Sequence, residues 1–184
     1  MPSETQIIEQ TRTWVEKVVV GLNLCPFAAP VVRKSTIRYA LCEAQDDEEI
    51  VTEFLMELDR LQQTDEVELS TTLLIIPALE DFYHYLDLLN IMQRQLKRAG
   101  LEGVFQLASF HPDYLFAGVP EDDRSHWTNR APYPTVHLIR EGEMSRALAH
   151  YKNPEQIPER NMQLLREMSD EQAKELYPHL FDQG

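Results

Sequence analysis

Two short segments of the chain gather side chains that could do chemistry. The first, residues 23–27, reads NLCPF and carries the thiol of Cys25. The second runs from FHPDY at 110–114 to NRAPYP at 129–134, and it carries an imidazole, carboxylates, an amide and a guanidinium. Loops are usually solvated and tolerant of change, so loops stiffened by proline that carry reactive groups are typical of a functional site.

Cys25 is the candidate nucleophile. Pro26 holds Cys25 out of helical geometry. If Pro26 opens a short helix through Ala29, Cys25 becomes its N-cap, and the free backbone N–H groups would lower the pKa of the thiol. Ala28 takes the fourth position of a C-x-x-C, so no local dithiol pair exists. The alternative is a buried cysteine that only fills space, as expected for Cys42.

His111 is the candidate general base or acid. It follows the third predicted strand, and ligands in open α/β sheets bind beyond the carboxyl ends of the strands. Asp113 is close enough in sequence to orient the imidazole ring. The alternative is a histidine that only hydrogen-bonds the backbone of its turn.

A third group of polar residues is predicted to bind substrate: Asn129, Arg130, His137 and Arg140. The planar fork of Arg130 suits a carboxylate or a phosphate. Pro134 could begin a short helix through Arg140, in which Arg140 and His137 would share a face. Alternatively, Arg130 ties its loop to Asp122 or Asp123. His126 is expected at the surface.

The sequence motifs give little support for a metal or cofactor site. His111, Asp113 and His137, with Cys25, could form a metal site, but their spacing matches no standard ligand signature. We therefore assign no metal ligand. The sequence also contains no P-loop, no dinucleotide glycine fingerprint and no G-x-S-x-G elbow.

Composition limits the partners and the location. The chain has 184 residues, 43% hydrophobic and 26% charged, with a formal net charge of −14. This charge argues against nucleic acid and anionic membrane as partners, although a basic pocket around Arg130 could bind a small anion. No apolar run approaches the roughly 20 residues of a membrane span. With two cysteines and no signal-like N-terminus, we expect a cytoplasmic location.

Hydrophobic periodicity predicts an α/β fold. One apolar stripe indicates an N-terminal helix, and strands are predicted at 36–42, 71–76 and 104–110. Helices capped by Asp46 or Asp47 and by Asp81 lie between them. This alternation predicts a small, mostly parallel sheet with flanking helices and the N-terminal helix on one face; a ferredoxin-like α+β fold is the alternative. We expect a single domain over 1–184, with its core at about 5–140 and a helical extension at about 143–180. Helices in the extension are predicted at 143–151, 159–168 and 170–177.

Several blocks of the sequence resemble a bacterial family of unknown function. They are Thr-x-x-Trp-Val at 11–15, NLCPF, FHPDY, the Asn-Arg and Pro-Tyr-Pro blocks at 129–134, His-Leu and Arg-Glu at 137–141, and IPERN at 157–161. The resemblance covers about residues 5 to 168. A serine is usual in that family where this chain has Ala131, so a hydroxyl there is not essential here. The resemblance implies that these blocks belong together, and it implies no reaction.

Three functional hypotheses follow from these residues. The leading one is a small-molecule hydrolase or transferase in which Cys25 attacks, His111 moves the proton and Asp113 orients His111. Asn129 and Arg130 would hold an anionic substrate group. The second is a metal-dependent enzyme that uses His111, Asp113 and His137. The third is a non-catalytic module that binds a small anion or a protein.

Overall fold

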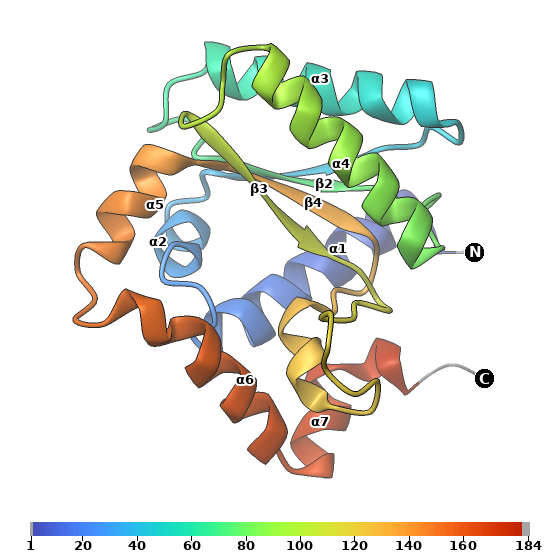
Figure 1. Cartoon of the computed structure of the whole chain (residues 1–184), viewed down its shortest axis with the longest axis vertical. Coiled ribbons are helices and arrows are strands. Elements are labelled where there is room, and N and C mark those ends of the chain that lie inside the picture. The colour runs from blue at the N-terminus through green and yellow to red at the C-terminus, as the bar shows by residue number, and fades with distance from the viewer. Residues whose placement is uncertain (1, 182–184) are drawn as a thin grey trace.

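Four strands form one mixed sheet in the order β1-β2-β4-β3 (Figure 1). The strands are β1 (Ile37–Leu41), β2 (Thr71–Ile75), β3 (Phe105–Phe110) and β4 (Thr135–Arg140). The structure is a computed structural model that describes residues 2–181. β1 and β2 are parallel neighbours, whereas β4 is antiparallel to both β2 and β3. The predicted α/β class is confirmed.

Two long helices cover one face of the sheet. α3 (Asp47–Gln63) joins β1 to β2 and is capped by Asp46, and α4 (Phe82–Arg98) joins β2 to β3 and is capped by Asp81. The side-chain oxygens of both aspartates accept hydrogen bonds from backbone N–H groups of the first turn, as the capping rule predicts. The helices lie side by side over the sheet (Figure 1).

The segment from Thr135 to Arg140 is a strand, so the helix predicted from Pro134 to Arg140 was wrong. Thr135, Val136 and Ile139 are β-branched, and the strand pairs along its length with β2 and β3. A central strand buried on both faces loses the polar alternation that identifies a strand in sequence. The element order β-α-β-α-β-β also differs from the β-α-β-β-α-β order of the ferredoxin-like alternative.

The two faces of the sheet pack against different groups of helices. Leu74, Val136 and Leu138 point to α3 and α4. Leu73 lies on the other face, in a cluster with Trp14 of the N-terminal helix. Because side chains alternate along a strand, His137 lies on the Leu73 face, as does Ala108 opposite it on β3.

The N-terminal helix changes its winding before it reaches the Cys25 segment. α1 (Glu4–Trp14) starts at a capping box formed by Ser3 and Gln6 and continues as a π-helical segment (η1, Val15–Val20). A Cβ at Gly21 would stand 2.0 Å from the carbonyl oxygen of Lys17, so only glycine fits the end of this segment. π-helical turns occur often at functional sites.

The remaining helices lie on the Leu73 side and at its edge: α2 (Ala28–Arg33), α5 (Glu141–Leu148), α6 (Ile157–Glu167) and α7 (Asp170–Leu176). The three predicted C-terminal helices are thus confirmed within a few residues. Leu165, Ala173 and Tyr177 of this part are buried in the same cluster as Trp14. No helix among residues 2–181 is both long and apolar enough to cross a membrane.

Tyr85 provides a test of how α4 is fastened to the sheet. Its buried hydroxyl donates a hydrogen bond to the carbonyl oxygen of Thr135 (2.8 Å) and accepts one from the N–H of Phe110 (3.1 Å). Tyr85→Phe removes both of these buried hydrogen bonds, so urea denaturation should show a loss of about 1–3 kcal/mol in the free energy of unfolding. Tyr83→Phe is the control, because the Tyr83 side chain is 70% exposed on the same helix. Equal stability of the two variants would contradict this account.

Candidate functional site

Two side chains of α6 hydrogen-bond the loop that carries Cys25 and hold it in place. Arg160 donates hydrogen bonds to the carbonyl oxygens of Asn23 (2.8 Å) and Leu22 (3.3 Å). Asn161 donates to the carbonyl oxygen of Leu24 (2.7 Å) and is itself buried. These contacts fix three consecutive carbonyl groups directly before Cys25.

Asn23 gives this loop its sharp turn. Its φ of 52° lies in the left-handed region, which asparagine tolerates better than most residues. The IPERN block therefore fixes the backbone of the NLCPF block.

Cys25 lies in a partly buried position before α2, and its thiol is neutral rather than activated. Cys25 was predicted to be the N-cap of the helix that follows it, but the N-cap of α2 is Phe27. Burial of the sulfur raises the pKa of Cys25 and outweighs the nearby backbone N–H groups of Phe27 and Ala28, which favour the thiolate. The expected lowering of the pKa is therefore wrong.

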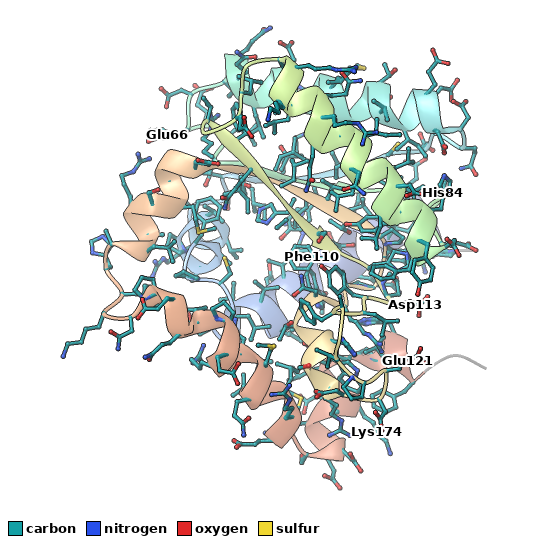
Figure 2. The ribbon with its side chains drawn as sticks, viewed as in Figure 1. Glu66, His84, Phe110, Asp113, Glu121 and Lys174 are labelled. Atoms are coloured by element: carbon teal, nitrogen blue, oxygen red, sulfur yellow. The ribbon has the colours of Figure 1, made fainter. Side chains whose placement is uncertain are left out.

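A cavity of about 440 Å³ opens in front of Cys25. It lies between the Cys25 loop, the end of β3, the 3-10 helix η2 (Arg124–Asn129) and α6. Its walls are formed by Val19, Leu24, Cys25, Phe110, Phe116, Thr128, Asn129, Ile157, Pro158, Asn161 and Met162. Its size falls in the range of pockets for small molecules. Figure 2 shows Phe110 near the middle of the molecule, at the end of β3.

His137 is the imidazole on the same face of the sheet as Cys25. Its ring centroid lies 6.4 Å from that of Phe27, two residues after Cys25, and 6.4 Å from that of Phe110, which lines the cavity. Burial lowers the pKa of His137 to about 4, so the ring is neutral at neutral pH. Ala108, directly opposite on β3, leaves room on one side of the ring.

Thr71 determines which nitrogen of His137 carries the proton. The Thr71 hydroxyl donates its single hydrogen to the carbonyl oxygen of Leu138, and its oxygen lies 2.8 Å from Nε2 of His137. Nε2 must therefore be the donor in this contact, which leaves Nδ1 as an unprotonated acceptor. Nδ1 makes no hydrogen bond to any residue that the structure describes.

His111 occupies a structural position on the α4 side. Its ring is only 1% exposed and lies 5.2 Å from the rings of both Phe82 and Tyr85. Nε2 lies 2.9 Å from the carbonyl oxygen of Leu79, and Nδ1 accepts the backbone N–H of Asp113 at 3.0 Å. Both ring nitrogens are thus occupied by backbone groups, and burial lowers the pKa of His111. The structure does not bring His111 and Cys25 into one hydrogen-bonded pair.

Asp113 and Arg130 lie near one another, outside the walls of the cavity. The Asp113 side chain is exposed, toward the edge of the molecule in Figure 2, and its backbone rather than its carboxylate orients His111. Arg130 donates from Nε to the carbonyl oxygen of Tyr114 (3.2 Å), and burial lowers its pKa while Asp113 opposes that change. The alternative partner Asp123 pairs instead with Arg166 (3.1 Å).

Of the other predicted substrate-binding residues, only Asn129 lines the cavity. Its Nδ2 donates to the carbonyl oxygen of Ser109 (3.0 Å). Arg140 does not share a face with His137, because three residues along a strand reverse the side. Its guanidinium instead donates to carbonyl oxygens at the end of α3, those of Leu61 and Thr64 (both 2.7 Å).

His126 is buried, and not at the surface as had been expected. Nδ1 accepts the N–H of Phe116 (2.9 Å), and Nε2 lies 2.8 Å from the carbonyl oxygen of Pro120. It therefore holds the proline-rich loop together.

The predicted metal set is dispersed. His111 lies on the α4 side, Asp113 is exposed and His137 lies on the opposite face. Within residues 2–181, no three His, Cys, Asp or Glu side chains come together as possible ligands.

Sequence reasoning missed three residues that shape the site. Thr71 sets the tautomer of His137, and Arg160 with Asn161 fixes the Cys25 loop. The IPERN block was a usable signal for the last two, since a polar Arg-Asn pair in an otherwise amphipathic helix needs partners. Thr71 gave no signal, because its partner is 66 residues away.

The tautomer of His137 is directly testable. Nitrogen-15 NMR of the imidazole should show a protonated Nε2 and an unprotonated Nδ1 in the wild type. Thr71→Val removes the acceptor for the Nε2 proton, so the Nδ1–H form should become populated. Thr71→Ser keeps the hydroxyl and should retain the wild-type spectrum. An unchanged tautomer in Thr71→Val would contradict the assignment.

The neutral state of His137 predicts a pH-dependent stability. The folded pKa is about 4 and the unfolded value about 6.5, so the unfolded chain binds the extra proton between these values. Stability is thus full above pH 6.5 and falls as the pH drops toward 4, with a loss of about 2 kcal/mol from pH 7 to pH 5. His137→Gln should reduce the difference between urea denaturation at the two pH values by this amount. His150→Gln, at an exposed position, should not; equal behaviour of both variants would count against buried neutral His137.

Comparison with known proteins identifies the family of the chain but no activity. A family model described as protein of unknown function (DUF1415) matches residues 6–175. Neither a curated protein nor a solved structure gives a significant match to the chain. The family match includes the Cys25 loop, the whole sheet and α6, which together form the candidate site. Because the match spans most of the sequence, the chain belongs to the DUF1415 family.

Proposed function

We propose that the protein is a thiol-dependent hydrolase or transferase for a small molecule, with Cys25 as nucleophile and His137 as base. The observation that carries the proposal is the cavity whose wall includes Cys25 and Phe110, with the His137 ring beside Phe110 and Phe27. A nucleophile, an acceptor nitrogen on the same face of the sheet and space for a substrate are groups that covalent catalysis needs.

The proposed base differs from the one that the sequence suggested. His137, first predicted to bind substrate, has an unprotonated Nδ1, whereas both nitrogens of His111 are engaged by backbone groups. We therefore assign the role of general base to His137 rather than to His111. Asp113 and Arg130 have no part in the proposal, because the Asp113 side chain is exposed and Arg130 donates to the carbonyl oxygen of Tyr114.

The proposed reaction begins with a neutral thiol and a neutral imidazole. His137 Nδ1 takes the proton of the Cys25 thiol as the sulfur attacks an electrophilic carbon of the substrate. The bond to the leaving group breaks, and the imidazolium returns the proton to that group. Water then attacks the thioester carbon while His137 takes its proton, the carbon–sulfur bond breaks, and the imidazolium returns the proton to the sulfur to regenerate the thiol. A second acceptor in place of water would give group transfer.

The backbone around Cys25 supports its role as attacking group. The nearby backbone N–H groups of Phe27 and Ala28 would stabilise the negative charge that develops on the sulfur. They sit on a loop fixed by Arg160 and Asn161, so the sulfur is held in place without help from the substrate.

Acylation by a neutral activated ester tests the proposal. With p-nitrophenyl acetate, intact-protein mass spectrometry should show one acetyl group per chain, mapped by peptide analysis to Cys25. Cys25→Ser should abolish the rapid phase, and His137→Gln should slow it by about 100-fold or more. Cys42→Ser should acylate like the wild type, because Cys42 is buried in the other cluster.

Two results would overturn this function. One is acetylation of the folded protein at a rate that does not change in Cys25→Ser. The other is a cavity that binds small molecules tightly while Cys25 never acylates, which would favour the non-catalytic binding module.

A further inference from the structure

The cavity in front of Cys25 has no charged side chain in its walls, within the part of the chain that the structure describes. Seven of its lining residues are apolar: Val19, Leu24, Phe110, Phe116, Ile157, Pro158 and Met162. A carboxylate or phosphate transferred into such a space would lose its hydration without gaining a counter-ion, which is strongly unfavourable.

The polar side chains in the wall already have partners in the protein. Asn161 donates to Leu24 and accepts from Arg160. Asn129 donates to Ser109 and accepts from the hydroxyl of Thr128. Each amide thus uses one N–H and one lone pair to hold a loop, and both amides are uncharged, so the thiol is the main reactive group of the wall.

The two arginines that adjoin cavity-lining residues in the sequence, Arg130 and Arg160, also have hydrogen-bond partners in the protein. Arg160 binds carbonyl oxygens of the Cys25 loop, and Arg130 binds that of Tyr114. Freeing either one would remove the hydrogen bonds that these carbonyl groups accept from it. The anionic substrate that the sequence suggested therefore has no binding group at this cavity.

We infer that the substrate is an uncharged carbonyl compound with an apolar acyl group, such as a neutral ester or thioester of a short branched or aromatic acid. This inference rests on the proposed function and names the substrate class of the same site. The acyl group would lie against apolar lining residues such as Phe110, Phe116 and Met162, with its carbonyl carbon at the Cys25 sulfur.

A series of p-nitrophenyl esters tests the substrate class. The rate of Cys25 acylation should be at least tenfold higher with butyrate and benzoate esters than with the succinate half-ester, whose acyl group ends in a carboxylate. Rates are corrected for the intrinsic reactivity of each ester by its reaction with free N-acetylcysteine.

Met162→Lys and Gln163→Lys form a matched pair of variants. Both add one cation to α6, but only residue 162 lines the cavity, while Gln163 is exposed. Met162→Lys should raise the relative rate of the succinate half-ester at least tenfold, and Gln163→Lys should leave the preference unchanged. Circular dichroism melting curves of both variants establish that they are folded.

The outcomes separate the two levels of the proposal. If the succinate half-ester acylates wild-type Cys25 as fast as butyrate, the substrate class is wrong while the thiol mechanism stands. If Met162→Lys and Gln163→Lys give the same preference, the cavity is not the acyl site. If no ester acylates Cys25, the proposed function fails, and the substrate class fails with it.

Discussion

The hydrogen bonds from α6 to the Cys25 loop are the constraint on which the candidate site depends. Asn161 and Arg160 bind the carbonyl oxygens of Leu24, Asn23 and Leu22, more than 130 residues earlier in the chain. These carbonyl groups belong to a turn, so they have no strand or helix to pair with. Without α6 the loop would lose its partners and the cavity would lose a wall. The C-terminal helices therefore complete the site rather than merely extend the fold.

The insertion of β4 into the middle of the sheet decides which histidine lies on the same face of the sheet as Cys25. Because β4 lies between β2 and β3, His137 projects to the face that α1, α2 and α6 cover. His111 follows the last residue of β3 and turns to the other side, against Phe82 and Tyr85 of α4. Two imidazoles that look equivalent in sequence thus lie in different environments: one is locked by backbone groups, and the other keeps a free acceptor nitrogen.

Most of the fold could be predicted because its signals are local. The aspartate caps of α3 and α4, the capping box of α1 and the buried run of β2 depend on residues within a few positions of one another. β4 could not be predicted in this way, since its identity as a central strand comes from pairing with β2 and β3. Pro134 suggested a helix start, but here it precedes a strand.

The candidate site was predictable only in part, for a related reason. Cys25 and Asn129 were found from their residue types and do border one cavity. The pKa of Cys25 was predicted in the wrong direction, because the sequence shows the neighbouring N–H groups but not the depth of burial that outweighs them. The partnership of Thr71 with His137 depends on strand register, which a single sequence does not fix.

An uncharged cavity inside a strongly acidic protein has a consequence for the proposed reaction. Hydrolysis of a neutral ester produces a carboxylic acid, which ionises at neutral pH and then has no counter-ion in the cavity walls. The formal net charge of −14 adds a repulsive field outside the cavity. Both effects favour the departure of the product and weaken its rebinding. The same distribution of charge that disfavours anionic substrates would thus limit inhibition by an anionic product. The lack of charge at the site and the excess of acidic residues on the surface would both weaken the binding of anions.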